Sequence, residues 1–334
     1  QGERVRRLKR LARRIAPLVG ADPDRAERAA MLAKADLVTG MVGEFPELQG
    51  VMGRYYALHD REPAEVADAI RDHYAPKGPS DAVPTAPVSI AVALADKLDQ
   101  LAGFFAIGER PTGSGDPYAL RRAGLGVIRT VRENGLRLHL LPLIEHAGAG
   151  FAEQGHKPAQ ASEILAFLAE RLRVQLRGEG VRHDVVAAVL AGGLEDDLNR
   201  ALSRAAHVET LLATEDGPNL LTAYRRAANI LAIEQRRDPV ALAEPDSALF
   251  TQEQEHGLST ALALIGPEID SYTESGNFGA AMAALAGLRR PVDAFFEHVT
   301  VNAREPELRR NRLRLLNGVR ATMDRVADFS QIEG

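Results

Sequence analysis

The stretch VSIAVALADKLDQLAGFF, residues 88–105, decides the fold class. It is mostly apolar, and its apolar residues recur at spacings of three and four, which predicts a buried helix. The rest of the chain has the same character: Ala and Leu dominate, runs of β-branched residues are short, and the spacing of three and four persists. The sequence therefore predicts an all-α fold.

Outward from this helix, breaks in the pattern mark the other elements. Asp22 followed by Pro23, and Asp116 followed by Pro117, are typical of an N-cap and the first helical residue. We expect a loop over 76–87, an irregular insert over 238–250, and a domain boundary in the Gly- and Pro-containing stretch 146–158. The expected helices cover about 5–18, 23–37, 65–74, 88–105, 117–133, 163–176, 185–190, 196–212, 217–231, 253–265, 267–275, 278–286 and 305–327.

Composition limits the class of protein. The chain has 334 residues, of which 45% are hydrophobic and 26% charged, as in an average globular protein with room for two or three domains. Cysteine is absent, which excludes disulfides and thiolate metal sites and fits a cytoplasmic location. No apolar run is long enough to span a membrane, and the first residues are too charged for a signal peptide. Because the sequence does not begin with Met, we expect a piece of a longer polypeptide.

The last expected helix carries an excess of positive charge in a protein whose net charge is −5. Between residues 304 and 325 there are seven arginines against three acidic residues, a local balance of +4. A basic strip on an otherwise acidic protein is the electrostatic footprint of nucleic-acid binding. A solvated helix face is the alternative. No Walker motif, glycine fingerprint after a strand, or Ser-His-Asp arrangement points to a catalytic site.

The stretch KADLVTGMVGEFPELQG, residues 34–50, raises the question of a metal site. Enzymes of the HD type bind divalent cations through an early His, a His-Asp pair and a later Asp. Here the pair reads Ala35-Asp36, the later carboxylate is Asp96, and no His precedes residue 59. Two carboxylates without imidazole predict no metal. We expect both to pair instead with Lys34, Lys97 or an arginine, because buried charge needs a partner.

Three further motifs admit both a chemical and a structural interpretation. Glu44 and Glu47 are conceivable acid/base groups, but a turn with Phe45 and Leu48 packed inward is favoured. His73 stands where multi-metal HD enzymes place histidines, and a hydrogen-bonded residue at a helix end is favoured there. PTGSGDP, residues 111–117, presents either a helix N-terminus for an anion, with Arg121 and Arg122 one turn on, or simply a capped loop.

Long ordered stretches resemble the C-terminal half of the beta subunit of bacterial heterotetrameric glycyl-tRNA synthetase. They cover most of the chain and read LAKADLVTGMVGEFPELQGVMGRYYA (32–57), VALADKLDQLAGFFAIGERPTGSGDPYALRR (92–122), RHDVVAAVL (182–190), NLLTAYRRAANIL (219–231) and PVDAFFEHVTVNAREPELRRNRLRLLNGVRATMDRVADFS (291–330). Gly115 departs from the family, which has Lys there, and removes one positive charge beside the PTGS loop.

The resemblance implies a degenerate HD-like helical domain over 1–147, a helical linker over 148–216 and an anticodon-binding helical domain over 217–334. It implies a non-catalytic chain that holds tRNA(Gly), with no cofactor of its own, no membrane and a cytoplasmic location. Glycine, ATP and Mg would be used by a partner alpha subunit in an α2β2 assembly. It implies tRNA contacts at Arg309, Arg310, Arg312 and Arg314, which match the closing motif of the family, and degenerate metal positions at Ala35, Asp36 and Asp96. Arg304, in the basic strip, and Arg121 and Arg122, after the PTGS loop, are further candidates for contact with tRNA.

Phe295, Phe296 and Arg304 are further candidates for stacking on exposed bases, although a Phe pair more often belongs to a core. Two alternatives stay open at this point. One is a metal-dependent phosphohydrolase of the HD type, and the other is a helical scaffold that holds partner subunits together.

Overall fold

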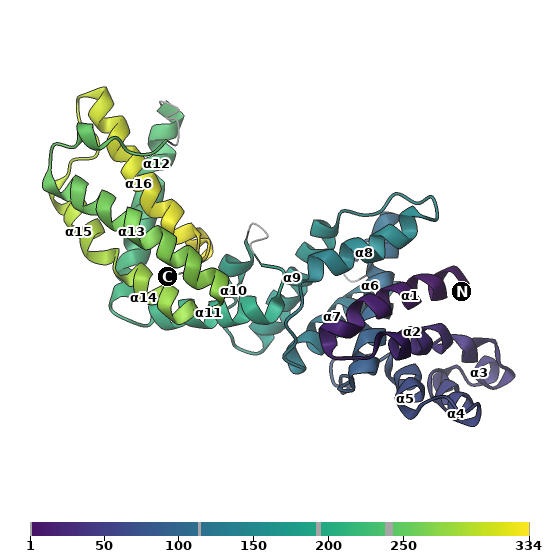
Figure 1. Ribbon diagram of the computed structural model, residues 1–334. Coiled ribbons are helices and arrows are strands. Elements are labelled where there is room, and N and C mark those ends of the chain that lie inside the picture. The colour runs from purple at the N-terminus through teal and green to yellow at the C-terminus, as the bar shows by residue number, and fades with distance from the viewer. Residues whose placement is uncertain (1, 113–114, 192–194, 238–242, 334) are drawn as a thin grey trace. The chain divides into compact units, whose positions relative to one another are not determined.

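The computed structural model describes residues 2–112, 115–191, 195–237 and 243–333. Within them every regular element is a helix, apart from an isolated bridge between Thr112 and Gly115, so the predicted all-α fold is confirmed (Figure 1). The chain divides into two compact units, one of residues 1–179 and 195–199 and one of residues 180–194 and 200–334. The expected division into three domains stays a prediction.

The N-terminal unit is built around α6, the helix predicted from residues 88–105. It spans Pro87–Ala106 and is buried along most of its length, since α1, α2, α5, α7, α8 and α9 all pack against it (Figure 1). The other α-helices of this unit are α1 (Gly2–Ile15), α2 (Pro23–Leu32), α3 (Gly40–Glu44), α4 (Val51–His59), α5 (Ala64–Asp72), α7 (Leu120–Glu133), α8 (Leu140–Ala152) and α9 (Ala161–Gly178).

The two predicted N-caps have different outcomes. Asp22 accepts hydrogen bonds from the backbone N–H groups of Asp24 and Arg25, as predicted. Asp116 also caps, but α7 starts at Leu120, so the prediction of Pro117 as its first residue is wrong. Ala119 has a left-handed φ of 55°, which keeps residues 117–119 out of the helix. The Asp116 carboxylate therefore reaches forward to the N–H groups of Leu120, at 2.7 Å, and Arg121, at 3.0 Å.

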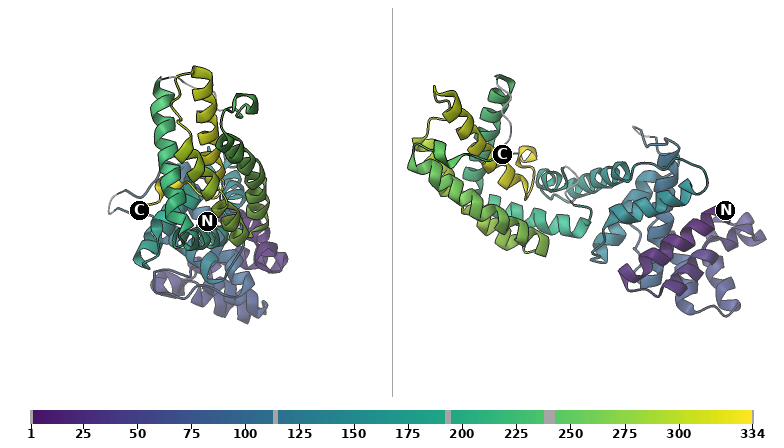
Figure 2. Two further views of the ribbon diagram at one scale, coloured as in Figure 1. Left: turned by 90° about the vertical axis from the view of Figure 1, so that its left-hand side faces the viewer. Right: turned by 45° about the horizontal axis from the view of Figure 1, so that its top comes forward.

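The C-terminal unit is a helical bundle. The long helices α12 and α16 lie side by side, and α13 packs on α14, α15 and α16 (Figures 1 and 2). Residues 200–212 of α11 belong to this unit. The helices are α10 (His183–Leu190), α11 (Leu198–Leu212), α12 (Asp216–Arg237), α13 (Glu253–Ser275), α14 (Phe278–Ala286), α15 (Arg289–His298) and α16 (Pro306–Asp324).

Helix α13 corrects one sequence prediction. Two helices were expected, broken before Pro267, but α13 continues through this proline. A proline inside a helix costs about 3 kcal/mol because it removes a hydrogen bond and crowds the preceding turn. Packing of α13 against three other helices offsets that cost. Of the expected insert over 238–250, residues 238–242 lie outside the described residues, and Ser247–Leu249 forms a short 3-10 helix capped by Asp246. Among all helices described, none has the length and apolar character to cross a bilayer.

Candidate functional site

A buried lysine occupies the centre of the expected HD-like site. Lys34 follows the end of α2, and its Nζ lies 2.7 Å from Nε2 of His73 and 3.2 Å from each carboxylate oxygen of Asp96. The ammonium also lies 3.9 Å from the centre of the Tyr74 ring, a cation–π contact. The Lys34 ammonium is thus surrounded by an acceptor at the end of α5, a carboxylate on α6 and an aromatic ring.

His73 has a defined role in this cluster. It caps the C-terminus of α5, and its Nδ1 lies 2.7 Å from the carbonyl oxygen of Ile70, to which it donates. Nε2 is therefore the acceptor for the Lys34 ammonium. Burial, together with the positive charge of Lys34, lowers the pKa of His73 to about 3, so the ring is neutral. The prediction of a hydrogen-bonded helix-end residue is confirmed.

The one carboxylate of the cluster is held by two cations. Burial opposes ionisation of Asp96, but Lys34 and Arg4 outweigh it and hold the pKa of this carboxyl below its ordinary value. The Arg4 Nη2 lies 2.8 Å from Asp96 Oδ1. Burial lowers the pKa of Lys34 to about 8 and that of Lys97 to about 8. The Lys97 ammonium donates to the carbonyl oxygens of His73 (3.2 Å) and Ala75 (2.7 Å). Pairing of Asp96 with Lys34 and an arginine is confirmed.

Asp36 does not pair with a cation in this way, and that part of the prediction is wrong. Its Oδ2 accepts from the backbone N–H groups of Gly50 at 2.6 Å and Gly53 at 3.1 Å, and so caps the first turn of α4. A Cβ on Gly53 would lie 3.1 Å from Asp36 Oδ2 and 2.6 Å from Ile70 Cγ2, so only glycine permits this approach. Ala35 is exposed.

The residues present do not fit a divalent cation. A metal bound by His73 and Asp96 would need their lone pairs as ligands. Nε2 of His73 and the Asp96 carboxylate already accept hydrogen bonds from the Lys34 ammonium. Its charge would also be repelled by Lys34 and Lys97, since like charges at short range in a buried site are costly. The contact between His73 and Lys34 was not predicted from the sequence, because the two residues are 39 positions apart.

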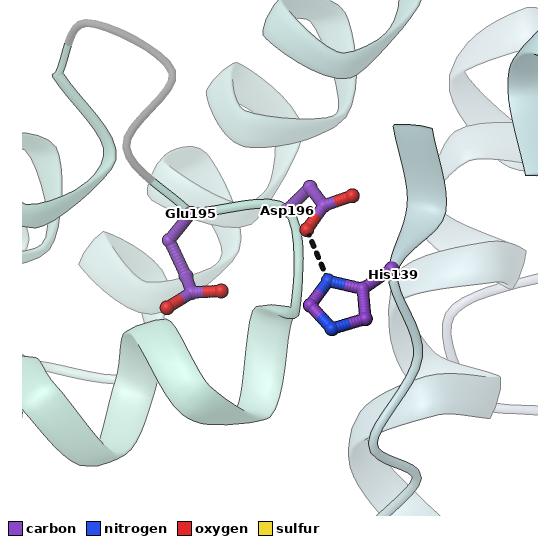
Figure 3. A group of neighbouring side chains, drawn as sticks. All are labelled: His139, Glu195 and Asp196. Atoms are coloured by element: carbon purple, nitrogen blue, oxygen red, sulfur yellow. Dashed lines mark hydrogen bonds and ion pairs between the residues drawn. The ribbon is translucent and has the colours of Figure 1, made fainter. Parts of the chain in front are cut away.

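One other group of side chains has the composition of a metal site. Within the described residues, His139, Glu195 and Asp196 bring one ligand atom each within 4.8 Å of one another (Figure 3). The Asp196 carboxylate is already in use: Oδ1 accepts from His139 Nδ1 at 2.7 Å, and Oδ2 accepts from the N–H of Leu141 at 3.0 Å, in the first turn of α8. The group therefore fastens residues 195–199 to the start of α8. No motif in the sequence pointed to this group.

The basic strip on α16 separates into buried, paired and open arginines. Arg312 is 4% exposed; its guanidinium lies 2.9 Å from Glu255 and also donates to Thr300 and Thr251. It follows Leu308 by four residues and precedes Leu315 by three, so it belongs to the apolar stripe, a signal present in the sequence.

The other predicted arginines of this strip are accessible. Arg309 lies 3.9 Å from Glu234 and Arg310 lies 3.3 Å from Glu307. Arg304 is exposed and makes no hydrogen bond or ion pair with a described residue. Arg314 is half-buried, its Nε has no partner among the described residues, and it lines a cavity of about 420 Å³ between α13 and α16. Open cationic charge is thus concentrated at Arg314 on α16 and at Arg304, which lies just before this helix.

The arginines after the PTGS loop are also at the surface. Arg122 is exposed, whereas Arg121 is half-buried and lies 3.5 Å from the carbonyl oxygen of Gly115. Residues 113 and 114 of the predicted anion-binding loop lie outside the described residues. Glu44 and Glu47 are exposed, and Phe45 is 44% exposed, so the expectation that Phe45 packs inward is wrong. Phe295 is fully buried, in agreement with a core role.

Two family models match the chain. One, described as the glycyl-tRNA synthetase beta subunit, matches residues 1–191, and the other, described as the DALR anticodon binding domain, matches residues 220–332. Among curated proteins, the glycine–tRNA ligase beta subunit of Paracoccus denitrificans is 52% identical over 335 residues, covering 100% of this chain and 48% of the relative. The same subunit of Rhodospirillum centenum is 51% identical over 342 residues, covering 99% and 47%. The chain thus spans about half the length of these relatives.

Proposed function

The chain belongs to the glycyl-tRNA synthetase beta subunit family, and we propose that it is the part of this subunit that binds tRNA(Gly) without catalysing aminoacylation itself. The observation that carries the proposal is the match of residues 220–332 to an anticodon-binding domain, in which Arg314 on the last long helix and Arg304 just before it are left open. Open guanidinium groups are suited to phosphate and to stacking on bases.

In the proposed complex Arg304 and Arg314 contact RNA directly. Arg310 joins them at the expense of an exposed pair with Glu307, which contributes about 1 kcal/mol or less. Arg309 joins them from its position 3.9 Å from the buried Glu234 carboxylate. We leave Arg312 out, because removing it from Glu255 would strand a buried carboxylate. In the N-terminal unit, we propose Arg121 and Arg122 as further contacts.

Catalysis is proposed to take place on a separate alpha subunit, which would bind glycine, ATP and Mg in an α2β2 assembly in the cytoplasm. The Lys34 cluster supports this division. Its histidine is neutral and already accepts a hydrogen bond, and its carboxylate is neutralised by two cations. These interactions argue against the alternative of a metal-dependent phosphohydrolase of the HD type.

The test is binding of tRNA(Gly) to the Arg304→Ala/Arg314→Ala double variant, measured by fluorescence anisotropy over a range of salt concentrations. Each phosphate contact contributes about −0.7 to −0.9 to the slope of log K against log salt, so loss of two contacts should flatten the slope by roughly 1.5. Arg320→Ala is the matched control: it lies on the same helix, but its guanidinium is held by Asn317 and lies 3.9 Å from Asp324.

Unchanged affinity and slope in the double variant would show that these arginines do not contact tRNA. Absence of binding by the parent chain itself would leave only the scaffold alternative, in which this chain holds partner subunits together.

A further inference from the structure

A groove crosses α6 above the Lys34 cluster, and the function proposed above does not use it as a whole. It consists of two hollows, of about 550 Å³ and about 400 Å³, that share Gln49, Tyr74, Asp96 and Gln100. We call the two together the α6 groove. Sites for small molecules in proteins measure about 300–1,000 Å³, so the larger hollow alone is of sufficient size.

The α6 groove is strongly positive. Its lining contains six cationic side chains and two carboxylates, those of Asp96 and Asp99, which gives a balance of +4 in a protein of net charge −5. A concave surface of one sign concentrates oppositely charged ligands. The six cations are Arg4, Arg7, Lys34, Lys77, Lys97 and Arg122. The occupant is therefore expected to carry more than one negative charge.

Three of these cations have hydrogen-bonding capacity that the protein leaves unused. Arg122 is exposed and makes no hydrogen bond or ion pair with a described residue. The Lys77 ammonium lies 5.8 Å from the centre of the Tyr74 ring and makes no hydrogen bond or ion pair with any residue that the structure describes. The Nε of Arg4 is buried without a hydrogen-bond partner among the described residues and lies 3.8 Å from Asp99 Oδ2, while its Nη2 binds Asp96. A buried N–H without a partner costs about 1–3 kcal/mol, so an acceptor from a ligand would be stabilising.

The other end of the groove is apolar and aromatic. Phe104 stacks on Tyr118 with ring centres 4.2 Å apart, and Phe151 lies 3.8 Å below the guanidinium of Arg7. Ile107, at the end of α6, is 63% exposed although it lines the hollow. This wall gives an inorganic anion nothing to bind. A flat ring would cover it and remove apolar surface from water.

We propose that the α6 groove binds a nucleoside phosphate, with its phosphate near Lys77 and Arg122 and its base against the wall formed by Phe104, Ile107 and Phe151. This ligand combines a multiply charged anion with a planar ring, as the lining requires. The ligand could be a free mononucleotide or a nucleotide within RNA, and competition distinguishes these sources. The inference does not depend on the arginines of α16.

The experiment titrates the 334-residue chain with AMP, GMP, CMP and UMP, and separately with inorganic phosphate, by saturation-transfer NMR and calorimetry. We expect at least one mononucleotide to bind in the millimolar range or tighter, and phosphate to bind more weakly. Lys77→Ala/Arg122→Ala and Ile107→Glu should each weaken binding at least tenfold. All three positions are exposed, so unchanged circular dichroism melting curves verify the fold.

Arg14→Ala is the matched control, because Arg14 is exposed in the same unit, makes no ion pair with a described residue and does not line the groove. The proposal is overturned if no mononucleotide binds, if phosphate binds equally well, or if both groove variants bind as the parent does. Competition by intact tRNA(Gly), but not by tRNA lacking its unpaired 3′ nucleotides, identifies an RNA terminus as the occupant. Competition by neither identifies a free nucleotide and leaves the proposed tRNA binding on α16 untouched.

Discussion

Replacing Lys34 with Met tests whether the ammonium acts as the internal cation of the N-terminal unit. Met retains the length of the stem but removes the charge. Asp96 then keeps only the Nη2 of Arg4, at 2.8 Å, and Nε2 of His73 loses its donor. Removing one partner of a buried ion pair costs about 3–5 kcal/mol. Because one cation remains on Asp96, we expect the lower end, about 3 kcal/mol of lost stability at pH 7.

The pKa of Lys34 determines how the stability difference between the wild type and Lys34→Met changes with pH. Burial lowers the pKa of Lys34 from 10.5 to about 8 in the folded state. Between pH 8 and pH 10.5 the unfolded chain binds more protons at this lysine than the folded chain does, so the free energy of unfolding rises with pH. The gain is complete above pH 10.5 and is lost as pH falls to 8. At about 1.4 kcal/mol for each pH unit, the wild-type protein gains about 3 kcal/mol that Lys34→Met does not. The gap between them should widen from about 3 to about 6 kcal/mol.

Two measurements check this reasoning. Hydrogen exchange of the α6 amides at pH 7 and at pH 10 reports the stability of the unit that contains Lys34. Carbon-13 labelling of lysine Cε gives only five signals, because the chain has five lysines, and the Lys34 signal should titrate near pH 8. Lys157→Met, at an exposed position, is the control. A gap that stays constant with pH, or a Lys34 titration at 10.5, would refute the argument.

Three further outcomes are expected. The hydrogen bond to Asp196 raises the pKa of His139. The contact should therefore stabilise the fold below pH 6.5, and this stabilisation should be lost as pH rises through the pKa that His139 has in the folded protein. NMR titration of Asp196→Asn should show a lower pKa for His139. Arg312→Met should destabilise the C-terminal unit by about 3–5 kcal/mol in urea unfolding, and adding Glu255→Gln should recover part of this loss. Gly126→Ala would place a Cβ atom 2.4 Å from Cε of Lys97, whose ammonium is held by two carbonyl oxygens. Thermal unfolding should therefore show a loss of stability of about 1–3 kcal/mol. An unchanged melting temperature would mean that the Lys97 side chain is free to move.

The helices were predictable because their signals are local. Residues 88–105 have the spacing of a helix and no wide polar face, and α6 spans Pro87–Ala106. The prediction failed where packing outweighs local preference. Pro267 ends a helix by propensity, but α13 is supported along its length by three neighbours. Pro117 is well suited to a first turn, but the left-handed Ala119 delays α7 by one turn.

The charged centre was predictable in composition but not in geometry. Missing imidazoles and an available lysine were enough to predict a paired Asp96 without metal. Which carboxylate would pair was not in the sequence, because Asp36 is drawn to the N–H groups of Gly50 and Gly53, 14 and 17 residues away. A local charge count has the same weakness on α16, where Arg312 adds to the +4 balance but faces Glu255 in the core.

A lysine at the centre of this unit has a consequence that a bound metal would not have. A metal ion can leave, and its site then collapses or rearranges, whereas the Lys34 ammonium is covalently attached and holds α5 and α6 together whenever the chain is folded. The same ammonium forms part of the floor of the α6 groove. The shape and charge of that groove are therefore fixed before any ligand arrives, and pre-organisation of this kind reduces the entropic cost of binding.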